Sequence, residues 1–276
     1  MTTIQSEGNL DMPVWIYKLP HWQLLLLFVG AAVCVCWGLI IILKPVMTRW
    51  FRSDHEDRNS IIDILVAGTG LFYGLLLGLV AVGAYTNYSN ADDSVSREAD
   101  AVGVLYRDIS NFPEPQRSGL RSELLRYIDV VINQEFPSAH HGELLAAASP
   151  VATEIHKQIA SFTPTTFGGE ALDSETLRQF ADMISARNQR LNQMAAGLPG
   201  TLWFVLIVGA VINLALIAML GINELNAHLA LSGIFAVFLS LMVFLIADLD
   251  HPFLGQYSIA PDAFETIRNV VIPQIG

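Results

Sequence analysis

The sequence predicts an all-α integral membrane protein: a four-helix transmembrane bundle with an extramembrane helical domain inserted between spans two and three. Apolar residues make up 53% of the 276 residues and charged residues only 15%, whereas about a quarter are charged in soluble domains. Four apolar runs reach the roughly 20 residues that cross a 30 Å hydrocarbon core. Between the second and third runs, apolar residues recur every three or four positions, and no segment alternates as a strand does.

The four predicted spans contain no charged residue and cover 22–43, 64–85, 198–222 and 229–247. The first run is too long for a cleavable signal peptide and has no basic stretch before it, so we read it as a permanent span. The expected organisation is an N-terminal tail at 1–21, spans one and two with a short basic loop at 22–86, the extramembrane helical domain at 87–197, spans three and four at 198–248, and a C-terminal tail at 249–276.

The loop between spans one and two holds the densest group of basic residues. Lys44, Arg49, Arg52 and Arg58 fall within 15 positions of one another. Basic residues favour the cytoplasmic side of a membrane. We therefore expect this loop in the cytoplasm and the helical domain outside it.

Composition also excludes several classes of function. The net charge is −11, whereas nucleic-acid binding needs a basic surface. Cys34 and Cys36 lie inside the first apolar run, which is not typical of a disulfide framework or a zinc site. No nucleophile elbow, phosphate-binding loop, dinucleotide fingerprint or metalloprotease motif occurs. We expect no enzyme activity, no cofactor, no metal and no nucleic-acid partner.

Small and polar residues in spans two and three are candidates for helix packing or for lining a pore. Gly70, Gly74 and Gly78 follow one another at every fourth position, so another helix backbone can approach them closely. Tyr73 lies between them, and Asn213 is a polar residue at mid-membrane depth that can bond across helices. The partner of the glycine face is either a helix of the same chain, or an oligomer interface or pore.

A second group of candidates is a charged cluster at the membrane edge. Asp63 precedes span two, where the helix dipole stabilises a carboxylate, although an intramembrane acid can also handle ions or protons. Asp248, Asp250 and His251 follow span four. They form either an interfacial stop, whose acids accept N–H groups or pair with arginines, or a site for a hard cation.

A third group consists of charged residues on the first and last helices of the insert. Glu98, Asp100 and Arg107 lie on the first helix, and Arg187 and Arg190 lie on the last. We expect an arginine of the last helix to contact an acid of the first helix or of the stretch after span four, because an unpaired arginine near the membrane is costly. These pairs either bridge helices or select ions at a vestibule.

Short motifs along the chain coincide with those of a known family. They are Tyr88 with Ala91, Glu98-Ala99, Leu105-Tyr106-Arg107, Pro113-Glu114-Pro115, the run 120–136 with Pro137, Arg187 and Arg190 followed by Leu198-Pro199, and the stretch D-L-D-H-P-F-L-G at 248–255. With these motifs the sequence resembles a bacterial four-span membrane family called bestrophin-like. The resemblance covers almost the whole chain after the first span, and the last motif is its most specific part.

The resemblance implies a multi-pass protein of the bacterial inner (plasma) membrane that forms a homo-oligomeric channel for small ions, with anions suggested by the bestrophin comparison. Its expected partners are membrane lipid, further copies of itself and small ions. The alternative is a non-conducting membrane scaffold or sensor whose helical domain binds a protein partner. A pore lined by span two favours the channel, and an exposed apolar groove on the insert favours the scaffold.

Overall fold

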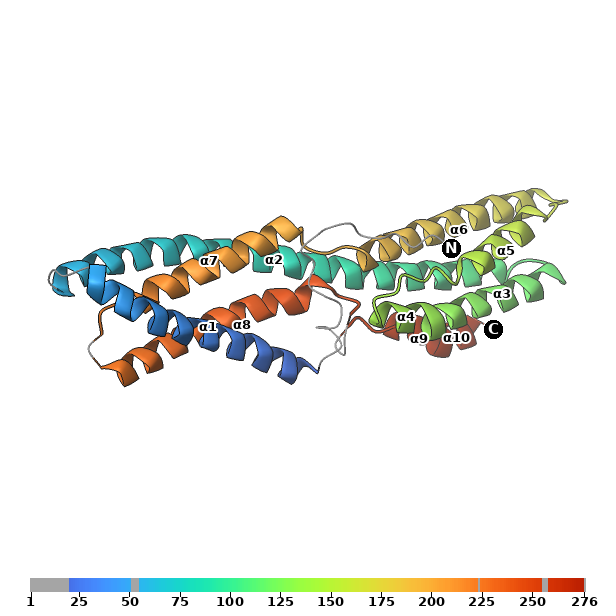
Figure 1. Cartoon of the computed structure of the whole chain (residues 1–276). Helices are drawn as coiled ribbons and strands as arrows, with labels where there is room; N and C mark the ends of the chain where they lie inside the picture. The colour runs from blue at the N-terminus through green and yellow to red at the C-terminus, as the bar shows by residue number, and fades with distance from the viewer. Residues whose placement is uncertain (1–19, 51–54, 223, 255–257, 276) are drawn as a thin grey trace. The chain divides into compact units, whose positions relative to one another are not determined.

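The structure is a computed structural model that describes residues 20–50, 55–222, 224–254 and 258–275. The expected tail at 1–21 lies almost wholly outside the described residues, as does Arg52 of the basic loop. Figure 1 shows helices, and the described residues contain no strand. The chain divides into two units. Unit 1 consists of residues 1–86 and 197–250, and unit 2 of residues 87–196 and 251–276.

Unit 1 contains the four membrane-spanning candidates. They are α1 (His21–Trp50), the first part of α2 (His55–Ile109), α7 (Gly200–Ala218) and α8 (Leu225–Asp250). Each helix is long and apolar enough to cross a membrane, and α1 lies along α8 (Figure 1). Large apolar side chains stay exposed on these helices, such as Phe72, Leu79 and Ile234. The predicted all-α membrane fold is therefore confirmed.

Side-chain bonds to backbone groups fix the helices of unit 1 to one another. Asn59, near the start of α2, binds Gly221 beyond the end of α7 through both the backbone N–H (2.9 Å) and the carbonyl (3.3 Å). The indole N–H of Trp37 on α1 donates to the Leu229 carbonyl on α8 at 3.1 Å. Gly233, one turn further along α8, leaves room for this indole. In a lipid environment such bonds satisfy polar groups that water cannot reach.

Unit 2 is a bundle of the C-terminal part of α2 and the remaining helices. These are α3 (Gln116–Val130), η2 (Val131–Glu135), α4 (Phe136–His140), α5 (Ser149–Ala160), α6 (Phe167–Met194), α9 (Asp262–Thr266), η3 (Ile267–Val271) and α10 (Ile272–Ile275). The helix α2 runs unbroken to Ile109 because no Pro or Gly lies between Tyr85 and Asn90. The next proline, Pro113, follows its end, in the turn before α3.

The core of unit 2 follows the apolar stripes of the sequence. Val102, Leu105 and Ile109 of α2 are fully buried, as are Leu120 and Leu124 of α3. After Pro115 the chain forms α3, then the π-helical turn η2, and α4 continues it through Pro137. A proline in the first turn of a helix needs no N–H partner there, so Pro137 is accommodated in α4.

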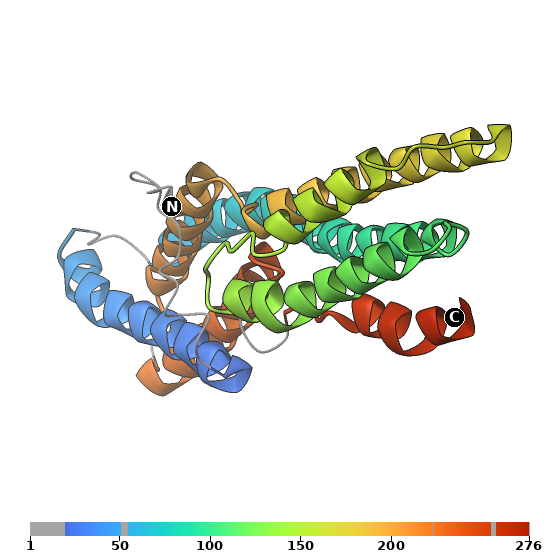
Figure 2. The same ribbon diagram turned by 90° about the vertical axis from the view of Figure 1, so that its right-hand side faces the viewer.

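The stretch expected as a C-terminal tail belongs to the core of unit 2. Phe253 and Phe264 are buried, and both rings lie 6.2 Å from the ring of Phe136. Both views place the short helices α9 and α10, drawn in red, beside the green helices α3 and α4 (Figure 1, Figure 2). The described residues after Pro252 therefore help to form the core of the helical domain instead of trailing from the last span.

Candidate functional site

The glycine face of α2 is open in the single chain. A Cβ atom added at Gly74 or Gly78 would meet no atom within 4 Å, and one added at Gly70 would meet only the Asn213 amide oxygen, at 3.9 Å. Leu71 and Leu75, which neighbour these glycines on α2, are 64% and 59% exposed. Within the described part of the chain, no helix therefore occupies the close-approach surface at Gly74 and Gly78.

Tyr73 and Asn213, in contrast, pack inside unit 1. The Tyr73 hydroxyl donates to the Leu206 carbonyl on α7 at 2.8 Å, and its ring lies so close to Gly209 that a Cβ there would come within 2.5 Å. The buried Asn213 amide donates to the Gly209 carbonyl at 2.9 Å and lies 3.4 Å from the Thr69 hydroxyl. Both side chains join α2 to α7, whereas the surface at Gly74 and Gly78 is in contact with none of the described helices.

The membrane-edge acids occupy different surroundings. Asp63 is exposed and lies eight residues after the start of α2 at His55. The field of a helix dipole falls off within the first turn, so the expected stabilisation of Asp63 by a helix start does not fit this position. Asp250 is buried, and its carboxylate accepts the Leu198 N–H at 2.5 Å and the Trp203 indole N–H at 3.0 Å. It therefore links the end of α8 to the start of α7.

The Asp248, Asp250 and His251 cluster gains no support as a cation site. Among the described residues, no group of three or more His, Cys, Asp or Glu side chains is arranged to hold a metal ion. All three residues take part in other interactions. Of the two alternatives for this cluster, the bonds of Asp250 correspond to the interfacial stop.

A charged network is buried in the core of unit 2. Arg190 of α6 is completely buried and binds Glu98 of α2 through two nitrogens, at 2.6 and 3.2 Å. The same guanidinium contacts Glu135 at 2.6 Å, and Arg187 binds the other oxygen of Glu135 at 2.8 Å. The Tyr127 hydroxyl donates to Glu98 at 2.6 Å. Two acids and two arginines balance one another, which is the condition under which buried charges are tolerated.

The charges of the network shift the pKa values of its members. Burial alone lowers the pKa of Arg190, but the adjacent carboxylates of Glu98 and Glu135 outweigh this effect and hold the pKa above its ordinary value. Burial and the charge of Glu98 raise the pKa of Tyr127 well above its ordinary value. Arg190 therefore stays charged and Tyr127 neutral over the physiological range. The Glu135 carboxylate also accepts the backbone N–H of Ala148 at 2.8 Å, which joins the stretch before α5 to the network.

The structure thus brings together only part of the predicted ion-pair group. Glu98, Arg187 and Arg190 meet, whereas Asp100 and Arg107 are exposed on α2 and lie outside the network. Sequence reasoning missed Glu135, which joins the two arginines. The available signal was an acid within an otherwise apolar stripe, directly before Phe136, where a charge has to find a partner.

Comparison with known proteins reveals relatives of similar architecture. A family model described as the bestrophin-like domain matches residues 30–264. Among solved structures, two variants of a bacterial bestrophin homologue from Klebsiella pneumoniae each align with a TM-score of 0.66 at 13% identity. They cover 90% and 91% of this chain, and 97% and 99% of their own chains.

A further structure of the Klebsiella pneumoniae bestrophin homologue aligns with a TM-score of 0.64 at 13% identity, covering 91% of this chain and 98% of its own. At such identities the likeness concerns the fold. No curated protein matches the sequence. The family model spans most of the chain, including three of the predicted spans and the helical insert. The chain therefore belongs to the bestrophin-like family.

Proposed function

We propose that this protein is a homo-oligomeric channel for small ions in the bacterial inner membrane, with anions as the expected permeant species. The observation that carries the proposal is the open glycine face of α2. Gly74 and Gly78 are free to approach a second copy or to line a pore, because no helix among the described residues covers them. The bestrophin-like fold and the four membrane-spanning candidates support the same function.

The exposed side chains around this face also favour an oligomer. Large apolar residues are exposed on both sides of the glycines, such as Phe72 and Leu79. Small residues on a membrane helix let two backbones pack closely, and dispersion contacts then stabilise the pair. A leucine at Gly74 would hold the neighbouring helix away while leaving the packing inside one chain unchanged.

The test is planar-bilayer recording of the purified full-length protein with a salt gradient, alongside the variant Gly74→Leu. Gly30→Leu is the matched control, because Gly30 on α1 is also exposed and a Cβ there meets nothing within 4 Å. We expect single-channel currents whose reversal potential follows the anion gradient. Gly74→Leu should alter or abolish them, and Gly30→Leu should not. Absence of current from an intact oligomer would contradict the proposal.

The second candidate is a membrane scaffold or sensor, and exposed apolar side chains on unit 2 favour it. Phe167 at the start of α6 is 87% exposed, and Leu144 and Leu145 lie exposed between α4 and α5. Such side chains suit a protein partner. A non-conducting protein that loses a bound partner on Phe167→Ser would support this function over the channel.

The proposed orientation has the basic loop at residues 44–58 in the cytoplasm and unit 2 outside, following the charge rule for loops. It can be tested with the variant Thr153→Cys, which places a thiol on an exposed position of α5. A membrane-impermeant thiol reagent should label it in intact spheroplasts. Labelling only after the membrane is opened would reverse the orientation without affecting the channel proposal.

A further inference from the structure

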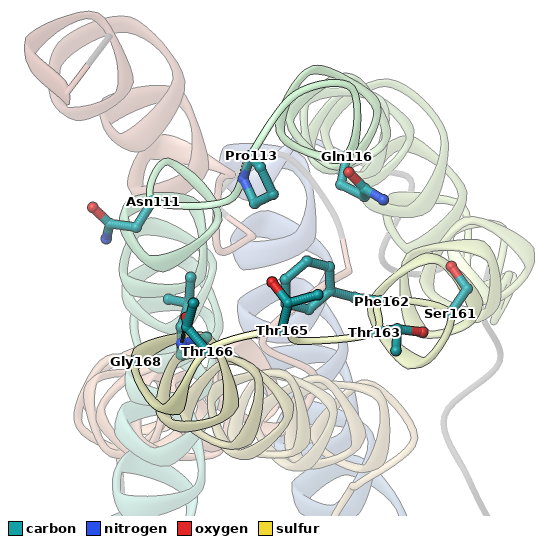
Figure 3. Close-up of a pocket in the computed structure, with 11 residues that line it drawn as sticks. Asn111, Pro113, Gln116, Ser161, Phe162, Thr163, Thr165, Thr166 and Gly168 are labelled. Atoms are coloured by element: carbon teal, nitrogen blue, oxygen red, sulfur yellow. Dashed lines mark hydrogen bonds between the residues drawn. The ribbon is translucent and has the colours of Figure 1, made fainter.

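A polar pocket of about 570 Å³ lies in unit 2, where two loops between helices meet. One loop joins α2 to α3, and the other joins α5 to α6. Figure 3 shows Pro113 and Gln116 of the first loop region opposite Phe162 and Thr165 of the second. The volume lies within the roughly 300–1,000 Å³ typical of small-molecule sites. The pocket is therefore large enough for a small organic ligand.

The lining of the pocket is polar but uncharged. No lining residue is ionisable, and the polar groups are the side chains of Asn111, Gln116, Ser161, Thr163, Thr165 and Thr166. In the described part of the chain, the Gln116 amide and the hydroxyls of Thr163 and Thr165 have no hydrogen-bond partner. Each of these groups can both donate and accept. They are available to a ligand that carries several hydroxyl groups.

One wall of the pocket is a fixed aromatic ring. The ring of Phe162 packs against Phe112, with centroids 4.9 Å apart and an interplanar angle of 57°. Phe112 is itself buried in the core of unit 2. Further apolar surface comes from Pro113 and Leu172. A ligand with an apolar C–H face as well as hydroxyl groups can use both surfaces, because aromatic rings bury a large apolar area at low conformational cost.

The pocket does not favour an anion, although α6 begins beside it. The cap of α6 is already satisfied, because the Thr166 hydroxyl accepts the Gly169 N–H at 3.1 Å. Glu170 lies in the first turn of α6, and Glu114 lies in the loop that carries Pro113. Glu114 is paired with Arg117 at 2.8 Å, so its charge is balanced. The carboxylate of Glu170 would repel an anion, and no cationic side chain lines the pocket to attract one.

We propose that this pocket binds a small neutral polyhydroxyl compound of the size of a monosaccharide or disaccharide. The hydroxyls of the ligand would bond to Gln116, Thr163 and Thr165, and its C–H face would lie on Phe162. The proposal is independent of ion conduction and gives unit 2 a ligand-binding role of its own.

The test is calorimetric titration of the full-length protein in a detergent without a sugar headgroup, because a maltoside headgroup would compete. Maltose and myo-inositol are the neutral probes, and sodium sulfate and sodium acetate are the anionic probes. The variant Gln116→Ala/Thr165→Val removes two hydrogen-bonding groups. Gly168→Phe adds a bulky ring at a position that lines the pocket, where a Cβ meets nothing within 4 Å. Thr153→Val is the control, since the Thr153 hydroxyl bonds within α5 and is exposed.

At millimolar concentration we expect at least one neutral probe to bind the unmodified protein and Thr153→Val equally. The double variant should weaken binding roughly tenfold, the loss expected for two net hydrogen bonds. Gly168→Phe should abolish binding while the helical content and melting temperature stay unchanged. The proposal is overturned if neither neutral probe binds, if the anions bind in their place, or if a neutral probe binds both pocket variants as tightly as the unmodified protein.

Discussion

The side chain of Arg190 makes several contacts in the buried core of unit 2. Its guanidinium is buried with Glu98 and Glu135, and it lies over the rings of Phe136 and Phe264 at 5.4 and 6.0 Å from their centroids. Lysine cannot reproduce a planar group that reaches two carboxylates at once. The identity of this residue, and not only its charge, is therefore expected to matter.

We expect Arg190→Gln to lower the free energy of unfolding by about 3–5 kcal/mol, because it leaves the buried Glu98 without its cation and Glu135 with Arg187 alone. Arg190→Lys should recover only part of this loss. Thermal unfolding of the detergent-solubilised protein, followed by circular dichroism, measures both. Arg178→Gln is the control, since Arg178 pairs with Glu175 and Asp182 on the exposed face of α6 and should change little. Equal effects of Arg190→Gln and Arg178→Gln would contradict the prediction.

His140 should make unit 2 sensitive to mild acid. Burial lowers the pKa of His140 below its ordinary value of 6.5. A hydrogen bond with the Ile259 backbone raises this pKa, and the charge of His141 lowers it further, so that the net shift is downward. The unfolded chain therefore binds the proton more readily than the folded chain. Stability from this residue is present above pH 6.5 and is lost as the pH falls below that value.

The measurement is the melting temperature between pH 7.5 and 5.5. We expect it to fall less in His140→Gln than in the unmodified protein. In His141→Gln the melting temperature should fall almost as much as in the unmodified protein, because His141 is exposed. An unchanged pH profile in His140→Gln would show that this histidine does not contribute.

At the level of whole elements, the contact between α2 and α7 depends on one glycine. A Cβ at Gly209 would lie 2.5 and 2.6 Å from two ring carbons of Tyr73, which real structures do not allow. Gly209→Ala should therefore separate the two helices and destabilise the protein by roughly 1–3 kcal/mol, as overpacking does. Gly74→Ala, with open space at its Cβ, should leave the melting temperature of the subunit fold unchanged or slightly raised, since alanine favours a helix.

A second substitution separates crowding from other causes. If the ring of Tyr73 is the obstacle, Tyr73→Leu should restore much of the stability lost in Gly209→Ala, because it removes the atoms that clash. The melting temperatures of the single and double variants form the comparison. Additive losses in the double variant would show that the clash is not the reason.

The spans and the long helix α2 were predictable because hydropathy and the absence of helix breakers are local properties of the sequence. The pairing of Glu98 with the last insert helix could also be anticipated from helix register. Glu135 was not recognised, because it lies on neither of the two helices expected to pair, and only the packed core of unit 2 brings it to Arg187 and Arg190. The bonds of Asp250 to Leu198 and Trp203 depend likewise on tertiary proximity. The spacing of Gly74 and Gly78 identifies them as candidates for helix packing. Spacing alone does not show whether a helix of the same chain already packs against them.

The C-terminal stretch was misread for a different reason. Its elements α9, η3 and α10 have five, five and four residues, which is too short to show a helical period. Its buried residues, such as Phe253 and Ile272, are complementary to a surface made by α3, α4 and α2. Only the assembled core of unit 2 reveals that these short helices complete it.

On the scale of the whole molecule, residues 256–276 should be indispensable. Their removal would expose Phe136 and the rest of the apolar surface that Phe264 covers, so we expect aggregation, measured by fluorescence-detected size exclusion. Phe264→Ala should cost about 3–5 kcal/mol, as large core deletions do. Val270→Ala is the control, because Val270 is half exposed. A truncated protein that elutes as a sharp, folded peak would contradict this expectation.

Because residues near Phe264 cover the core of unit 2, this core can be completed only after the end of the chain has been synthesised. Residues 87–196 leave the ribosome before α7 and α8 have entered the membrane, and the chain that contains Phe264 follows both. At about 5–20 residues per second, the 80 positions from 196 to 276 take on the order of 4–16 s. During this interval the helical insert has an uncovered apolar face. Insertion of the last two spans therefore limits how soon the nascent insert can complete its fold, and a delay there would leave it exposed to chaperones and proteases.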